Sequence, residues 1–398
     1  MELWRTIVAG AVVAVALQGC GAAAVRPDPL PGSLAADAAV PGIPGVRYWG
    51  DVSPPGFDRW LALPDAALAE RYAGVMNRSH EYLLLSGGGA QGAFGAGLLV
   101  GWTASGSRPD FEVVTGVSTG ALIAPFAFLG PDYDQVLEEA YTSLSTEDLV
   151  ERRGLLQIVR GDAAADTRRL RAVIARYLDD AAIGAIAAEG RKGRSLLVGT
   201  TNLDAGRPVI WDITAIAASG SPRAAELIRD VVLASTSIPG AFPPVLIEVE
   251  AGGRRYTEMH VDGGVASQVF LGPSALDWRA IAERLGVQGT PRLFVIRNGW
   301  LERAWETTEP RLVPILNRTI STLIHSQSLG DLAKIYLVSR RDGLDFNLAH
   351  VPDTFTEEPQ EVFDVDYMRK LFALGRSMAE SGFPWARERL EPGSTGSP

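Results

Sequence analysis

Ser118 lies in the stretch Gly116-Val117-Ser118-Thr119-Gly120, which matches the G-x-S-x-G pattern of serine nucleophiles. Residues 111–117, rich in Val, precede the serine and an apolar run follows at 119–129, so we expect a strand, a sharp turn and a helix. Small neighbours permit such a turn, and a helix N-terminus behind the hydroxyl favours negative charge that develops during a reaction. This context favours a nucleophile over a serine that only caps the helix.

A glycine cluster, Gly87 to Gly89, follows a shorter apolar run at residues 82–85. Its spacing with Gly92 fits a dinucleotide-binding turn, but it also fits a loop whose N–H groups hold an oxyanion. A dinucleotide site needs an acidic residue at the end of the next strand, where this chain has Gly116 and Ser118. We therefore predict that the N–H groups of Gly87 to Gly89 form an oxyanion hole beside the serine.

Asp262 is the predicted general base. It stands in His260-Val261-Asp262-Gly263-Gly264, at the expected end of a strand and before a glycine turn. Asp-Gly by itself is typical of a surface turn. Residues two apart on a strand point the same way, so a serine–histidine–aspartate triad that includes His260 stays open as the alternative.

The N-terminal 20 residues resemble an export signal. Arg5 precedes an apolar run at residues 7–17, which is shorter than the roughly 20 residues of a membrane-spanning helix. The run ends in Leu17-Gln18-Gly19-Cys20, which resembles a bacterial lipobox, and Cys20 is the chain's only cysteine. We expect a lipoprotein anchored through Cys20 to a membrane of the bacterial cell envelope, on the periplasmic or outer-membrane side.

Composition limits the class of protein. The 398 residues are 46% hydrophobic and 21% charged, which is enough apolar material for a large core. A formal net charge of −10 argues against a nucleic-acid partner. Strand and helix patterns alternate from residue 82 onward, with strands expected near 195–199, 208–211, 245–249, 256–261 and 291–297 and helices near 224–234, 312–329 and 366–380. This alternation predicts an α/β fold with a mostly parallel sheet.

Three motifs together resemble those of the patatin-like phospholipases, in the same order. They are Gly87-Gly88-Gly89-Ala90-Gln91-Gly92, the serine stretch around Ser118, and Asp262-Gly263-Gly264. A fourth block, residues 234–239 continuing to 242–244, is also similar to the family. Two positions depart from the family pattern, because members often carry Asp at Ser86 and a cation at Gln91.

The resemblance implies a three-layer α/β/α domain with a serine–aspartate dyad and no catalytic histidine. Ser118 would attack an ester carbonyl of a lipid or phospholipid and Asp262 would accept its proton, with Gly88 and Gly89 the preferred oxyanion donors and an acyl-enzyme as intermediate. No cofactor or metal ion is expected. The competing class is a non-catalytic lipid-binding or scaffold protein on the same fold.

We predict four segments along the chain. They are a signal peptide at 1–20, a tether and lead-in rich in Pro, Gly and Ala at 21–77, the hydrolase domain at 78–390, and a flexible tail at 391–398. Residues 149–159 could cover an acyl cleft, and Trp300 and Trp305 could touch lipid, although packing against the core is the simpler interpretation of both.

Overall fold

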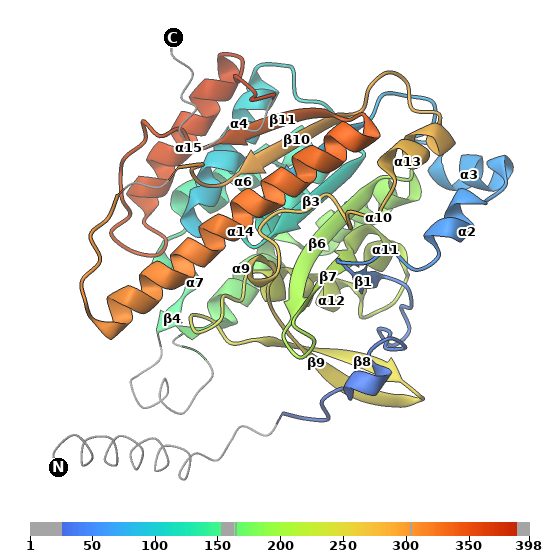
Figure 1. Ribbon diagram of the computed structural model, residues 1–398, viewed down its shortest axis with the longest axis horizontal. Helices are drawn as coiled ribbons and strands as arrows, with labels where there is room; N and C mark the ends of the chain where they lie inside the picture. Colours follow the sequence, from blue (N-terminus) through green and yellow to red (C-terminus); the bar gives the residue numbers. More distant parts are fainter. Residues whose placement is uncertain (1–25, 153–162, 164, 303–304, 388–398) are drawn as a thin grey trace.

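A computed structural model describes residues 26–152, 163, 165–302 and 305–387 (Figure 1). Nine of the described strands form one sheet in the order β1-β7-β6-β3-β2-β10-β11, and the hairpin of β8 and β9 joins it through β6. The central strands β6, β3, β2, β10 and β11 run parallel, whereas β1, β7 and β9 run antiparallel to their neighbours. The prediction of a mostly parallel sheet with helices is therefore confirmed.

The strands of this sheet are short, as is usual for a parallel core. They are β1 (Arg47–Trp49), β2 (Glu81–Leu85), β3 (Val113–Val117), β6 (Ser195–Asn202), β7 (Arg207–Asp212), β8 (Val245–Ala251), β9 (Arg254–Asp262), β10 (Arg292–Arg297) and β11 (Asp345–His350). A separate pair comprises β4 (Glu151–Arg152) and β5 (Ala165–Asp166).

The described helices range from single turns to one of 31 residues. The α-helices are α2 (Phe57–Leu61), α3 (Asp65–Tyr72), α4 (Gly92–Ala104), α5 (Thr119–Leu129), α6 (Asp134–Ser143), α7 (Thr146–Leu149), α9 (Arg168–Tyr177), α10 (Asp180–Arg191), α11 (Ile213–Ala218), α12 (Ala224–Ser235), α13 (Trp278–Leu285), α14 (Leu312–Asp342) and α15 (Val365–Glu380). The 3-10 turns are η1 (Gly32–Leu34), η2 (Gly89–Gln91), η3 (Pro131–Tyr133) and η4 (Gly263–Val265).

Helices cover both faces of the sheet, which makes three layers (Figure 1). On β2, Leu83 and Leu85 pack into the larger hydrophobic cluster, which includes α4, α5, α12 and α15. The alternate residues Tyr82 and Leu84 pack on the other face, against α13 and α14. A strand buried on both faces needs apolar residues at every position, and this explains the unbroken run at residues 82–85.

Helices α4 and α15 pack with their backbones in close contact. A Cβ atom on Gly97 would lie 2.0 Å from the carbonyl oxygen of Phe372, and one on Gly101 would lie 2.2 Å from that of Arg376. Glycines on α4 therefore set how closely the two helices approach. The loop that precedes α4 carries Gly87 to Gly89, so the helix that follows this loop is the one packed against α15.

Part of the segment predicted as a tether is packed against the folded domain. Arg47 to Trp49 pair with β7 as an antiparallel edge strand, and Ile43 and Val46 are buried in the larger core cluster. Arg47 also forms an ion pair with the buried Glu258. The stretch therefore packs against the sheet through its few apolar residues. In the lead-in, α2 and α3 are separate helices, and Pro64, which cannot donate a helical hydrogen bond, lies directly before α3.

Several predictions concern residues outside the described ones. They include the signal peptide with Cys20, the part of the 149–159 stretch beyond residue 152, and the tail at 391–398. The predicted domain boundaries accordingly remain predictions. In the part of the chain that is described, no helix is both long and apolar enough to cross a membrane.

Candidate active site

Ser118 occupies a strained turn between β3 and α5. Its backbone angles, φ 54° and ψ −124°, lie in a region that residues other than glycine rarely adopt. The turn is tight because its flanks are glycines: a Cβ on Gly116 would lie 2.4 Å from the carbonyl oxygen of Gly120, and one on Gly120 would lie 2.3 Å from that of Leu85. The sharp strand-to-helix turn expected from the sequence is present, and it holds the serine at the end of β3.

The side chains of Ser118 and Asp262 meet directly. The serine Oγ donates a hydrogen bond of 2.7 Å to Oδ2 of Asp262, and the N–H of Gly264 donates one of 2.7 Å to Oδ1. Asp262 ends β9 and Ser118 follows β3; both strands are neighbours of β6, so the sheet brings together two residues 144 positions apart. Both side chains are buried.

Burial raises the pKa of Asp262 from 3.8 to about 6, against the opposing effect of the hydrogen bonds from Ser118 and Gly264. The desolvated carboxylate is thus a stronger base than a free aspartate, yet it is mostly ionised at neutral pH. A general base works best with a pKa near the working pH. The arrangement can therefore take the proton of a serine hydroxyl as that hydroxyl attacks.

The glycine loop lies beside this pair. The N–H groups of Gly88 and Gly89 bond to no acceptor among the described residues, and Gly89 lines the same cavity as Ser118. Gly87 differs from the prediction, because its N–H already donates to the backbone oxygen of Gln268 at 3.0 Å. Gly87 instead permits close approach, since a Cβ there would lie 3.2 Å from Cβ of Ser118.

Ser235 braces the serine turn, a role that the sequence did not reveal. Its fully buried Oγ accepts a hydrogen bond of 3.0 Å from the N–H of Ser118 and donates one of 2.7 Å to the carbonyl oxygen of Gly199. The residue lies in the block at 234–239 that resembles the family. Its partners are backbone atoms of segments distant in sequence, so no residue pattern predicts these hydrogen bonds.

Gln268 and Asn298 hold the glycine loop in the same way. The Gln268 side chain donates to the carbonyl oxygen of Gly264 at 2.7 Å, so this residue links the loop to the turn after Asp262. The Asn298 side chain donates to the carbonyl oxygen of Ser86 and accepts from the N–H of Gly95. The loop is thus fixed at both of its ends.

His260 does not take part in the dyad. Its Nε2 lies 3.1 Å from a carboxylate oxygen of Glu258, its Nδ1 lies 2.9 Å from Oγ1 of Thr200, and the ring is fully buried. Burial lowers its pKa, against the opposing effect of Glu258. Both ring nitrogens are therefore occupied by partners other than Ser118 and Asp262, which does not favour the triad alternative.

An apolar cavity of about 100 Å³ opens beside Ser118. Its described lining includes no Asp, Glu, Lys or Arg side chain, and its polar end is formed by Gly89, Ser118 and Thr119. The remaining lining is formed by Leu122, Phe126, Leu137, Ala140, Tyr141, Leu144, Leu149, Leu170, Val173, Ile174, Tyr177, Leu178, Val232, Thr236, Ile238, Phe242, Phe363 and Met368. Such a cavity can hold a hydrocarbon chain with its carbonyl end at the serine.

Gln91, one of the two positions expected to depart from the family pattern, is half-buried and donates to the hydroxyl of Tyr367 over 3.4 Å. Tyr367 lies on α15 next to Met368, which lines the apolar cavity. Gln91 therefore joins the start of α4 to the helix that walls the cavity, and it adds no charge there.

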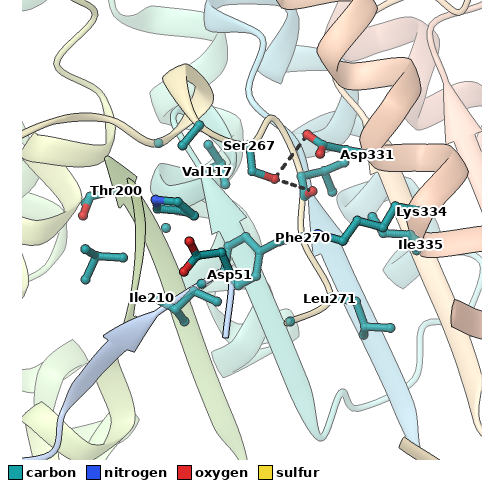
Figure 2. A pocket seen from close by; sticks show the side chains of 18 of the residues that line it. Asp51, Val117, Thr200, Ile210, Ser267, Phe270, Leu271, Asp331, Lys334 and Ile335 are labelled. Atoms are coloured by element: carbon teal, nitrogen blue, oxygen red, sulfur yellow. Dashed lines mark hydrogen bonds between the residues drawn. The ribbon is translucent and has the colours of Figure 1, made fainter. Parts of the chain in front are cut away.

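A second cavity, of about 230 Å³, lies on the α14 side of the sheet (Figure 2). Val117 and Gly263 line it, but their neighbours Ser118 and Asp262 do not. Asp331 of α14 accepts a hydrogen bond of 3.2 Å from Ser267, drawn as a dashed line in Figure 2. This region is where the C-terminal half of α14 docks on the sheet.

No group of three or more His, Cys, Asp or Glu side chains among the described residues is arranged to hold a metal ion.

Comparisons with known proteins agree with these motifs. Residues 83–273 match the family model described as patatin-like phospholipase, and no curated protein matches the chain. The solved structure of VipD from Legionella pneumophila is similar with a TM-score of 0.41 and 14% identity, over 76% of this chain and 66% of that one, just under two thirds of VipD. Residues 83–273 of this chain are therefore similar to the patatin-like phospholipase family.

Proposed function

We propose that this protein is a serine acyl hydrolase that cleaves carboxylic esters of lipids or phospholipids. The observation that carries the proposal is the hydrogen bond between Ser118 Oγ and Asp262 Oδ2 at the mouth of an apolar cavity. The proposal is also supported by a strained nucleophile turn, a carboxylate with a raised pKa, and loop N–H groups that bond to no acceptor in the described part of the chain.

In this mechanism, Ser118 Oγ attacks the ester carbonyl carbon while its proton passes to Asp262. The carbonyl oxygen becomes an oxyanion held by the N–H groups of Gly88 and Gly89. Collapse breaks the bond to the alcohol, which leaves with the proton from Asp262. Water then attacks the acyl-enzyme, gives its proton to Asp262 and releases the fatty acid, and the proton returns to Ser118.

The cavity supports an acyl chain as the part of the substrate that is recognised. Its lining is apolar and uncharged, and Gln91, a position where the family pattern noted in the sequence often has a cation, carries no charge. Neutral or zwitterionic esters therefore fit this site better than substrates that need a cation near the carbonyl.

We further propose that Cys20 is lipidated and holds the protein on a membrane of the bacterial cell envelope. The support is the apolar run that ends in Leu17-Gln18-Gly19-Cys20. Mass spectrometry of the N-terminal peptide tests this: an unmodified Cys20 in membrane-extracted protein would contradict it.

Labelling with a fluorophosphonate and an acyl-ester panel test the enzyme proposal. Wild type should be labelled at Ser118 and should hydrolyse the esters, whereas Ser118→Ala and Asp262→Asn should lose at least about a hundredfold in turnover. His260→Gln is the matched variant for the triad alternative and should keep most of the activity. Folded wild-type protein that neither reacts nor hydrolyses would point to a scaffold instead.

A further inference from the structure

In the N-terminal half of α14, polar side chains face the protein and apolar side chains face outward, the opposite of a usual amphipathic surface helix. Positions 314, 318, 321, 325 and 328 face the protein at helical spacing, yet they carry Pro, Arg, Ser, His and Ser. The outward face carries large apolar side chains, namely Leu312, Ile315, Leu316, Ile320, Leu323 and Ile324. Leu312 is 73% exposed and Leu323 is 65% exposed.

The same helix has the usual orientation further along. Leu332, Ile335 and Val338 face inward and belong to the core cluster under the sheet. The reversal is therefore confined to the part of α14 that extends beyond the sheet toward the left edge of the view in Figure 1. Apolar side chains turn outward over several turns when something apolar covers them.

Polar groups on and beside this outward face are already satisfied. The hydroxyls of Thr319 and Thr322 donate to the carbonyl oxygens of Ile315 and Arg318, four residues earlier in each case. Such back-bonding hides a hydroxyl from an apolar medium.

The flanks of the helix also suit a lipid surface. Arg311 pairs with Glu309 and Arg318 pairs with Glu306, so these charges are balanced locally. Trp305, just before the helix, is 95% exposed, and tryptophan favours the boundary between lipid and water. The surface is thus apolar, flanked by an aromatic side chain and nearly neutral.

This face is continuous with the proposed active site. Gln327 donates to the carbonyl oxygen of Val265 over 3.4 Å, and Val265 is itself 47% exposed only three residues after Asp262. Four residues further on, Asp331 accepts from the N–H of Gln268, which in turn holds the glycine loop. Whatever covers the helix therefore lies beside the turn that carries the catalytic carboxylate.

From these observations we propose that the outward face of residues 305–324 binds the surface of a neutral phospholipid bilayer and brings the active site to its substrate. The face is of the interfacial kind, in which a helix lies in the membrane plane with its apolar side among the acyl chains. The effect on catalysis rests on the proposed function, but binding to the bilayer can be tested separately.

A site-specific fluorophore tests the binding. The full chain with Cys20→Ser and Ile320→Cys carries an environment-sensitive dye at residue 320. A matched chain with Cys20→Ser carries the dye at Leu337→Cys, and Leu337 is exposed in the C-terminal half of the same helix. Phosphatidylcholine vesicles should shift the emission to the blue at 320 and leave it unchanged at 337. Equal responses at both sites, or a shift at 320 without vesicles that disappears on dilution, would overturn the proposal, and the second result would indicate a second copy of the chain.

A pair of double variants tests the consequence for activity. Leu316→Gln with Leu323→Gln should lower hydrolysis of phosphatidylcholine vesicles by about tenfold or more and leave a soluble butyrate ester unaffected. The control, Leu203→Gln with Leu337→Gln, changes equally exposed leucines elsewhere and should alter neither rate. A loss shared by both substrates or by both double variants would refute the role of this face. If wild type does not hydrolyse the soluble ester in a Ser118-dependent way, the enzyme proposal is refuted. The fluorescence experiment would still test whether this face binds the bilayer.

Discussion

Replacing the buried carboxylate should abolish activity and at the same time stabilise the fold. Asp262→Asn keeps the shape of the side chain, its acceptor for the N–H of Gly264, and a polar group facing Ser118. It removes the charge, which burial disfavours. We therefore expect an inactive protein that resists unfolding better than wild type at neutral pH.

The magnitude follows from the pKa of Asp262. This pKa is about 6 in the folded chain, against an ordinary value of 3.8. Between these values the folded state holds more protons than the unfolded state, so the stability of wild type falls as the pH rises from about 4 to about 6. Above pH 6 the whole penalty applies, roughly 3 kcal/mol at about 1.4 kcal/mol per pKa unit. For a chain of 398 residues this corresponds to about 3 to 4 °C in Tm.

Thermal unfolding of wild type, Asp262→Asn and Ser118→Ala at several pH values between 4 and 8 provides the measurement. The advantage of Asp262→Asn should be largest near pH 8 and should shrink toward zero near pH 4. Ser118→Ala is equally inactive but retains the carboxylate, so its stability should still fall as the pH rises, and the fall should extend to a somewhat higher pH because the hydrogen bond from Ser118 no longer lowers the pKa of Asp262. An Asp262→Asn protein that is less stable at pH 8, or a difference that does not change with pH, would refute the assignment of Asp262 as a buried, destabilised base.

Four further outcomes are expected. The kcat/KM for a soluble ester should rise with pH through about 6 and then level off, because only the ionised Asp262 can accept a proton; a flat profile from pH 5 to 8 would contradict this. Ser235→Ala should lower kcat about tenfold and leave KM nearly unchanged, because the N–H of the nucleophile loses its acceptor; steady-state kinetics with butyrate esters check it. Val173→Trp should fill part of the apolar cavity and lower the ratio of kcat/KM for octanoate over butyrate esters about tenfold, whereas an unchanged ratio would place the acyl chain elsewhere. Arg47→Met should lower the free energy of unfolding by about 3 to 5 kcal/mol, because it leaves Glu258 buried without its cation; urea unfolding measures this loss.

Elements with a strong local pattern could be predicted from the sequence. The strand before Ser118 and the helix after it, at 119–129, were predicted because mostly apolar segments meet small residues at a turn. Strand β1 escaped prediction because Arg47 to Trp49 is only three residues long and acquires its structure by pairing with β7. Helix α14 was predicted only to residue 329, since its apolar face changes sides near that point and interrupts the periodicity.

Some residues of the candidate site could be predicted from the sequence and others could not. Ser118 and Asp262 could be identified because nucleophile and base chemistry requires those residue types in glycine-rich turns. Ser235 and Gln268 could not, because they act through hydrogen bonds to backbone atoms that only the folded chain places nearby. The donor role predicted for Gly87 fails for the same reason: its N–H is taken by a backbone oxygen that is distant in sequence.

The contact between α4 and α15 determines how much of the chain is needed to fold. The segment that matches the family ends at residue 273, yet α4, inside that segment, is packed backbone to backbone against residues 365–380. A fragment cut at the family boundary would also lose β10, the neighbour of β2, and would leave that strand with an open edge. The motifs that define the family are thus not a self-sufficient folding unit, and expression trials should retain the chain through α15.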